Sequence, residues 1–167
     1  MIKNNIVTVY SDGSYQNINN NHYIGMSLFI IHPDFSDIKI AKAKKVLQPN
    51  IYNASYAETQ ALIIFLDYIN NEENFYLNKE IYLYSDSEKV VKILNDKIKY
   101  LSCLKKKYMN ILNKFNIKAF WIKGHLKEKG NFHKNKIFII KINNINLLIY
   151  FYYAVSDCVK SYSNTSA

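Results

Sequence analysis

Residues Ile6–Tyr15, with the sequence IVTVYSDGSY, decide the fold that the rest of the chain must build. The β-branched and tyrosine residues are typical of a buried central strand, and the strand spacing breaks at Asp12 and Gly13. An unpaired carboxylate in such a strand is costly to bury, so Asp12 needs a partner. Asp-Gly is also a common hairpin turn, and that interpretation stays open until the other motifs are considered.

Composition narrows the class of protein. A chain of 167 residues is expected to form one domain, residues 1–167. Its 22 basic residues are all lysine and face 13 acidic ones, and the resulting net charge of +9 favours a polyanionic partner over a merely soluble basic surface. Cys103 and Cys158 lack the spacing of a disulfide scaffold or zinc site, and Met1–Asn5 is too short for a signal peptide. We therefore expect an intracellular protein of the cytoplasm or nucleus, not a secreted one.

Hydrophobic periodicity predicts the first half of the fold. The strand Ile6–Tyr15 is expected to be followed by a polar turn and two further strands in a meander. Apolar residues then recur at three and four positions, which predicts an amphipathic helix capped by Asn53 or Ser55. Glu58 is expected in the first turn of that helix, where a capping role is the alternative to a functional one. The segments are the turn 16–22, the strands 23–32 and 38–47, the helix 55–69 and a polar loop 70–79.

The second half alternates strands and helices. Glu80–Tyr84 is a predicted strand, and Asp86 follows it at the carboxyl edge of the sheet, where open α/β folds bind ligands. Asp86 or Ser87 as a plain helix N-cap is the alternative. Helices around 88–98 and 101–115 and a strand at 117–122 complete the pattern, and His125 stands in the loop that follows. Lys105–Lys107 is the main basic cluster of this half and is the expected contact for phosphates if it is more than a solvated face.

Three acidic residues occupy comparable places beside the predicted sheet. Asp12, Glu58 and Asp86 would meet in apolar surroundings, which is unfavourable unless a cation neutralises them. Hard oxygen ligands select Mg²⁺ or Mn²⁺. The three carboxylates therefore predict a metal site.

Four strings in this order resemble the type 1 ribonuclease H family: VYSDGSY, NASYAETQAL, IYLYSDSEKVVKIL and FWIKGH, within residues 6–125. The resemblance implies an α/β, ribonuclease H-like fold with a five-stranded mixed sheet, three antiparallel strands first and then parallel ones, with helices on its faces. It implies an endonuclease that cuts the RNA strand of RNA/DNA hybrids with two Mg²⁺ ions, with Mn²⁺ as a substitute, and leaves 5′-phosphate ends. Asp12, Glu58 and Asp86 would be metal ligands, and His125 would assist product release or proton transfer.

The same resemblance suggests which residues contact the hybrid. A hybrid is recognised through its minor groove and 2′-hydroxyls, so binding independent of base sequence is expected. The candidates are the groups around the carboxylates: Gly13, Ser14, Asn53, Ser55 and Ser87. We expect a monomer without a membrane segment or an obligate protein partner.

The chain departs from the family pattern near its end. The family's fourth carboxylate falls at Asn135, which is a poor ligand for a cation, and the next acidic residue is Asp157. Asp157 would be the fourth catalytic and metal-binding carboxylate if residues 136–154 are an insertion, expected as an extra strand or hairpin. A translated non-coding stretch is the competing interpretation of that segment.

Two other functions remain open at this stage. A degenerate ribonuclease H-like module would bind nucleic acid without cutting it, because the insertion displaces Asp157. A transposase, junction-resolving or exonuclease relative would keep the fold and change the substrate. The Asp-Gly-Ser, Ala-Glu and Ser-Asp-Ser strings favour ribonuclease H over those relatives.

Overall fold

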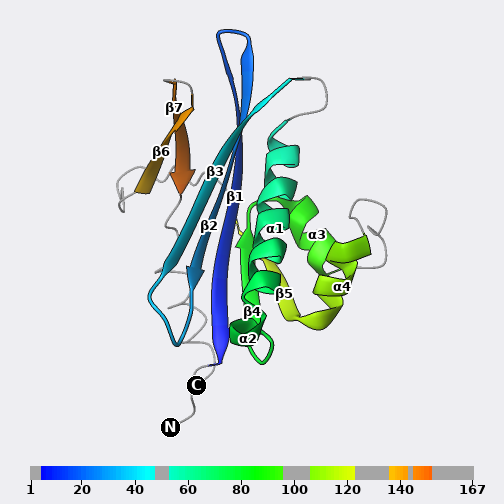
Figure 1. Cartoon of the computed structure of the whole chain (residues 1–167). Helices are drawn as coiled ribbons and strands as arrows, with labels where there is room; N and C mark the ends of the chain where they lie inside the picture. The colour runs from blue at the N-terminus through cyan, green and yellow to red at the C-terminus, as the bar shows by residue number, and fades with distance from the viewer. Residues whose placement is uncertain (1–4, 48–52, 96–105, 123–135, 143–144, 152–167) are drawn as a thin grey trace.

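Strand β1 (Ile6–Ile18) is the middle strand of a five-stranded sheet in the computed structural model, which describes residues 5–47, 53–95, 106–122, 136–142 and 145–151 (Figure 1). The strand order is β3-β2-β1-β4-β5. The other elements of this domain are β2 (Asn21–Ile31), β3 (Ile38–Val46), α1 (Ala54–Asn71), α2 (Glu73–Tyr76), β4 (Glu80–Ser85), α3 (Glu88–Asn95), α4 (Lys106–Lys114) and β5 (Asn116–Trp121).

Pairing across the sheet changes direction at β1. Strand β2 runs antiparallel to both β1 and β3, whereas β4 runs parallel to β1 and β5 runs parallel to β4. The parallel pairs are joined by helical crossovers, as parallel strands require. The predicted mixed sheet, with the antiparallel strands first and the parallel strands after them, is therefore confirmed.

The hairpin of β1 and β2 is longer than the sequence predicts. Residues 16–22 were expected to form a turn, but the ladder continues to the pair Ile18 and Asn21. Only Asn19 and Asn20 form the turn, with φ values of 50° and 60°. Asparagine tolerates this left-handed backbone better than most residues, and two such residues in succession match the twist of a tight hairpin. The other residues of the segment 16–22 thus belong to partly exposed strand ends.

Strand β1 also runs straight through the Asp-Gly pair. Asp12 is paired with Ser27 and Gly13 with Met26 in the ladder of β1 and β2. The hairpin-turn interpretation of Asp-Gly is therefore wrong, as is the expectation that the strand breaks there. Asp12 lies inside a central strand, and its carboxylate remains a partly buried charge that needs an explanation.

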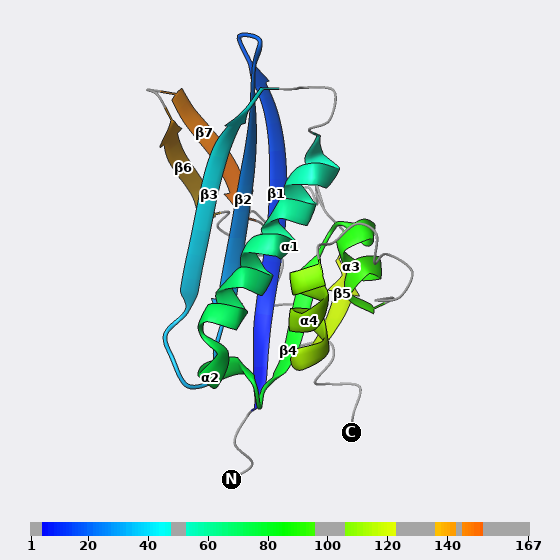
Figure 2. The same ribbon diagram turned by 45° about the vertical axis from the view of Figure 1, so that its right-hand side comes forward.

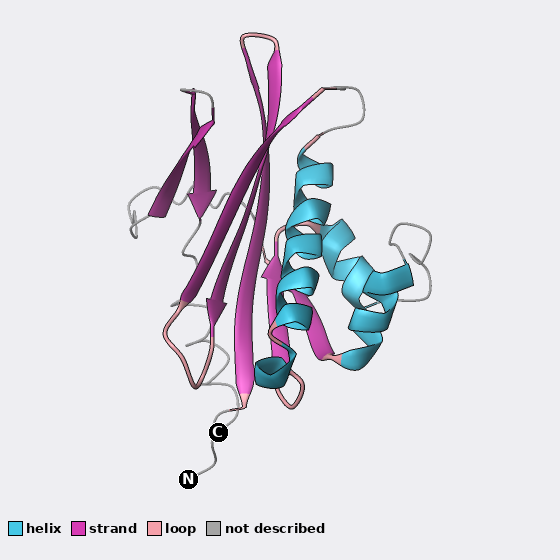
Figure 3. Cartoon of the chain, viewed as in Figure 1, coloured by secondary structure: helices cyan, strands magenta, loops and turns pink. Residues whose placement is uncertain are grey.

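The described helices α1, α3 and α4 lie on the same side of the sheet (Figure 3). Asn53 is the N-cap of α1, and its Oδ1 accepts a hydrogen bond of 2.9 Å from the backbone N–H of Tyr56. The buried face of α1 packs with the apolar side chains of the central strands, and the main core includes Val7, Val9, Leu62, Phe65, Leu66, Ile81 and Leu83. This packing fixes α1 against β1 and determines where its first turns lie.

The segment 70–79 is not simply the polar loop that its composition suggests. It contains the end of α1 and the short helix α2, because Tyr76 is buried at 1% exposure beneath the first crossover. The edge of the His32 ring contacts Tyr76, with 5.3 Å between the ring centres. Of the three apolar residues in this stretch, Phe75, Tyr76 and Leu77, only Tyr76 is buried, and it anchors the connection between α1 and β4.

Residues 136–151 form a second, two-stranded sheet of β6 (Lys136–Ile142) and β7 (Ile145–Phe151), paired antiparallel from Lys136 with Phe151 to Ile142 with Ile145. The hairpin lies beside β2 and β3, on the side away from α1 (Figure 2). A hairpin is one of the two forms expected for the segment 136–154. Its origin as an insertion stays a prediction. Among the described residues, no helix is long and apolar enough to cross a membrane.

Candidate metal centre

Three elements bring the predicted carboxylates together. Asp12 comes from β1, Glu58 from α1 and Asp86 from the residue that follows β4. One carboxylate oxygen from each of the three side chains lies within 4.8 Å of the others. Strands β1 and β4 are parallel neighbours and α1 packs on β1, so acids separated by dozens of residues in sequence share one site.

Gly13 determines how closely α1 approaches β1. A Cβ atom at Gly13 would lie 2.2 Å from the backbone nitrogen of Glu58 and 2.4 Å from the carbonyl carbon of Ala57. Both atoms belong to the helix backbone, so neither can rotate away as a side chain would. Only glycine permits this contact, and the contact holds Glu58 next to Asp12.

Glu58 lies just beyond the first turn of its helix, the turn in which it was expected. Because Asn53 is the cap and α1 begins at Ala54, the first turn contains no acidic residue and Glu58 begins the second turn. The free N–H groups that stabilise an acid at a helix start are therefore not its partners. Glu58 is only 8% exposed, and its Oε2 has no hydrogen-bond partner among the described residues.

Asp86 is positioned by hydrogen bonds to the backbone on both sides of it. The Ser87 N–H donates to Ser85 Oγ at 3.1 Å, and the Ile122 N–H donates to the Ser85 carbonyl at 3.0 Å. The indole Nε1 of Trp121 donates to the carbonyl of Asp86 itself at 3.0 Å. Sequence reasoning missed Trp121, although the only tryptophan of the chain, at the end of the strand beside β4, was a usable signal.

The electrostatics of the site follow from burial and like charge. Burial, and next the charge of Asp86, raise the pKa of Asp12 from 3.8 to about 7. Burial, then Asp12 and Asp86, raise the pKa of Glu58 from 4.5 to about 9. The backbone N–H of Gly13 hydrogen-bonds both carboxylates and offsets part of each increase. The site thus lacks positive charge, which a proton or a cation can supply.

The donor set fits a hard divalent cation. Three carboxylates supply oxygen ligands of the kind that Mg²⁺ and Mn²⁺ prefer. The buried Glu58 Oε2 without a partner is otherwise unexplained, because buried carboxylate oxygens in proteins are nearly always hydrogen-bonded. Asp12, Glu58 and Asp86 are therefore the residues that would hold a metal ion here.

The predicted substrate contacts divide into capping residues and free groups. Asn53 caps α1, and the Ser87 carbonyl accepts the first hydrogen bond of α3, at 3.2 Å from the Val91 nitrogen. Ser55 is exposed at the start of α1, and its carbonyl accepts a bond from Thr59 Oγ1. Ser14 Oγ is buried without a partner in the described part of the chain. Contact of these residues and of Gly13 with nucleic acid stays a prediction.

His125 and Asp157 lie outside the described residues, as does Asn135. Their proposed roles near the carboxylates are therefore predictions from the sequence. The described centre consists of three acids, and the expectation of a fourth rests on the resemblance alone.

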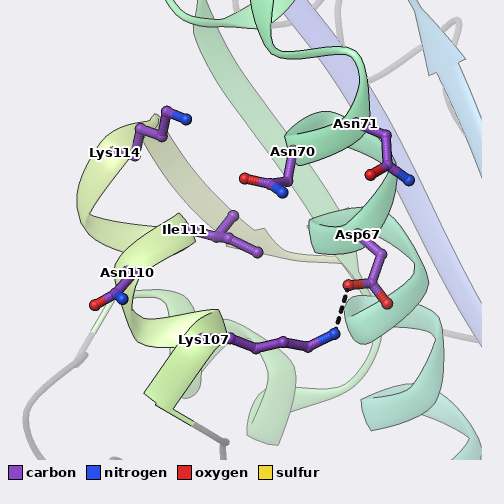
Figure 4. Close-up of a pocket in the computed structure, with 7 residues that line it drawn as sticks. All are labelled: Asp67, Asn70, Asn71, Lys107, Asn110, Ile111 and Lys114. Atoms are coloured by element: carbon purple, nitrogen blue, oxygen red, sulfur yellow. Dashed lines mark hydrogen bonds and ion pairs between the residues drawn. The ribbon is translucent and has the colours of Figure 1, made fainter.

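The basic cluster predicted at Lys105–Lys107 is described only from Lys106 onward. Lys107 forms an ion pair of 3.2 Å with Asp67 across a cleft of about 340 Å³ between α1 and α4 (Figure 4). Asp67 lies nine residues beyond Glu58, or about 14 Å along the helix axis. Lys114 at the same cleft is paired with Glu73. These two lysines are therefore engaged with acids of their own chain.

The mixed sheet, the helices on one side and the carboxylates at the junction of β1, α1 and β4 define a ribonuclease H-like fold with a candidate metal centre. A solved structure with this fold is LC11-RNase H1, isolated from compost by a metagenomic approach. It is 17% identical, the match covers 72% of this chain and 86% of that one, and the TM-score is 0.51.

Two further solved structures are similar to the chain. RNase H1 from the halophilic archaeon Halobacterium salinarum NRC-1 is 18% identical over 71% of this chain and 86% of that one, with a TM-score of 0.49. LC11-RNase H1 in complex with an RNA/DNA hybrid is 16% identical over the same shares, also with a TM-score of 0.49. No family model and no curated protein matches the sequence. The similarity to LC11-RNase H1 with the TM-score of 0.51 thus supports the fold alone, and function must be argued from the site.

Proposed function

We propose that the protein is a metal-dependent endoribonuclease that hydrolyses the RNA strand of RNA/DNA hybrids. The observation that carries this proposal is the cluster of Asp12, Glu58 and Asp86, whose carboxylate oxygens lie within 4.8 Å of one another in a ribonuclease H fold. The charge of the chain, +9, suits a polyanionic substrate. Three of the four motifs of the sequence resemblance lie on the elements that build this cluster, and the described part of the fourth, residues 120–122, lies at the end of β5 beside β4.

The carboxylates would act as ligands for two Mg²⁺ ions, with Mn²⁺ as a substitute. Bound divalent ions supply charge neutralisation at the scissile phosphate and a water of lowered pKa. Glu58 contributes the buried carboxylate, and Asp12 and Asp86 contribute two partly buried ones from β1 and from the end of β4. If Asp157 folds back onto this site, it would add the fourth.

The chain's remaining groups position the ligands and the substrate. Gly13 keeps α1 against β1, and Trp121 fixes the backbone of Asp86. In the reaction, water adds to the phosphorus, the bond to the 3′-oxygen breaks, and that oxygen takes up a proton. We assign the transfer of this proton or the release of product to His125, and contacts with the minor groove to Ser14 and its neighbours.

The test is cleavage of a labelled RNA/DNA hybrid in Mg²⁺ or Mn²⁺, with double-stranded RNA and single-stranded RNA as competing substrates. Wild-type protein is expected to cut only the hybrid, and Asp12→Asn or Asp86→Asn should abolish cutting while the fold persists. The matched control is Asp67→Asn, which neutralises an acid at the other end of α1. Cutting that survives in Asp12→Asn would refute the assignment of the site.

A binding module without nuclease activity is the second candidate, and one observation favours it. Asn135 stands where the family's fourth carboxylate is expected, so the centre has only three acids unless Asp157 supplies the fourth. In that case folded protein binds the hybrid and does not cut it. Deleting residues 136–154 and repeating the assay then distinguishes a displaced Asp157, whose activity returns, from a true binding module.

A further inference from the structure

A small aromatic pocket lies at the end of α1 that is remote from the carboxylates. It has a volume of about 220 Å³ and is lined by Phe35, Ile38, Tyr68, Glu72, Phe75 and Tyr76. Tyr68 is ten residues beyond Glu58 in α1, or about 15 Å along the helix axis. The pocket is therefore separate from the proposed active site.

The walls of the pocket are fixed in place by His32. Its Nε2 donates to the carbonyl of Phe75 at 3.2 Å, and its Nδ1 accepts from the N–H of Asp34 at 3.1 Å. His32 is only 4% exposed, and its two hydrogen bonds link the loop before β3 to α2. Both segments carry a wall of the pocket, which is thus formed before any ligand arrives.

Two of the four rings that line the pocket are open to solvent. Phe35 and Phe75 are 47% and 46% exposed, and their rings meet edge to face with 4.9 Å between centres. Tyr68 and Tyr76 also meet at a steep angle, with 5.9 Å between centres. The two half-exposed phenylalanines offer ring faces and ring edges to a ligand, whereas Tyr68 is partly buried and Tyr76 is only 1% exposed.

Glu72 is the one charged residue in the lining. The nearby lysines are already engaged, since Lys79 pairs with Asp34 at 2.6 Å and Lys114 pairs with Glu73. No ion pair to Glu72 occurs among the residues that the structure describes. The Glu72 carboxylate lies near enough to Tyr76 to contribute to the upward shift in the pKa of that phenol, for which burial is the main cause.

An unpaired carboxylate among aromatic rings is complementary to an organic cation. Ring faces attract ammonium groups, and a nearby carboxylate adds charge attraction. The same carboxylate repels phosphates, which opposes a role for this pocket in nucleic-acid binding. We propose that the pocket binds the ammonium group of a lysine side chain, unmodified or methylated, on a partner protein.

The full chain, carrying isotope-labelled phenylalanine, is titrated with three small probes, and the phenylalanine resonances are followed by NMR. The probes are Nα-acetyl-lysine amide, its Nζ-trimethylated form and the neutral Nα-acetyl-norleucine amide. We expect both cationic probes to shift the resonances of Phe35 and Phe75 with dissociation constants in the millimolar range, whereas the neutral probe leaves them unchanged. Because the chain itself carries 22 lysines, the spectra are also compared across protein concentrations to separate self-association from binding of the probes.

Glu72→Gln should weaken binding of the cationic probes about fivefold, and Phe75→Leu should weaken it further. The matched control is Glu73→Gln, which removes the adjacent carboxylate outside the lining and should bind as the wild type does. Thermal melts verify that each variant is folded. Equal response to the neutral probe, no response to any probe, an unaltered affinity in Glu72→Gln, or displacement of the probes by an oligonucleotide would each overturn the proposal.

Discussion

Without metal, the carboxylate cluster should make the protein less stable as the pH rises. The pKa of Asp12 is about 7 in the folded chain against 3.8 ordinarily, so the folded state holds a proton that the unfolded state has released. A raised carboxyl pKa favours folding at low pH and disfavours it as pH rises through the window between the two values. For Asp12 alone, the free energy of unfolding should fall by about 2.5 kcal/mol between roughly pH 5 and pH 8. Glu58, with a pKa of about 9, acts in the same direction.

Urea denaturation in EDTA at a series of pH values measures this loss. Asp12→Asn removes one buried charge and relieves Glu58, so its pH profile should be flatter and its stability above neutral pH higher than that of the wild type. Saturating Mg²⁺ should restore the wild type at high pH and do little for the variant. Asp67→Asn, at an exposed ion pair, should retain the wild-type profile. A flat profile for metal-free wild type, or an Asp12→Asn variant that is no more stable above neutral pH, would refute the electrostatic account of the site.

Three substitutions test the surroundings of the cluster. Gly13→Ala should lower the free energy of unfolding by at least about 2 kcal/mol in urea denaturation, because its Cβ meets the backbone of Glu58; a wild-type value would show that α1 can move. Trp121→Phe keeps an aromatic ring but loses the indole N–H that donates to the Asp86 carbonyl, so calorimetry should show about tenfold weaker Mg²⁺ binding. Unchanged affinity would show that Trp121 does not position Asp86. Asn53→Ala should lower the free energy of unfolding, measured by thermal denaturation, by about 1 kcal/mol because α1 loses its cap. No change would mean that another group replaces the cap hydrogen bond.

The sequence predicted the sheet and the three acids because both depend on strong local signals. Alternating and continuous apolar runs identified five strands, and the change to a three-and-four period identified α1. Each acid stood beside such an element, and the order of the elements then brought the acids to one place. Their convergence could be inferred before any distance was known.

What the sequence did not predict depends on contacts across the chain or on small details of the backbone. The tight turn at Asn19 and Asn20 was hidden in a polar run that has several possible turns. Helix α2 exists because Tyr76 finds a buried site under His32, which no local pattern reveals. The bond from Trp121 to the Asp86 carbonyl likewise appears only when β4 and β5 are paired in register.

The cluster cannot relieve its own repulsion by spreading apart. Gly13 has no side chain to hold α1 away from β1, and Leu62, Phe65 and Leu66 of α1 are packed in the core. Asp86 is held by the backbone bonds of Ser85 and by Trp121.

With movement blocked on both sides, the remaining ways to lower the energy are to take up protons or to bind a cation. Protons neutralise the cluster when the pH is low, and a divalent ion neutralises it when the pH and the concentration of the ion are high enough. The rigidity that makes the empty cluster unfavourable is therefore what would make it a selective metal site.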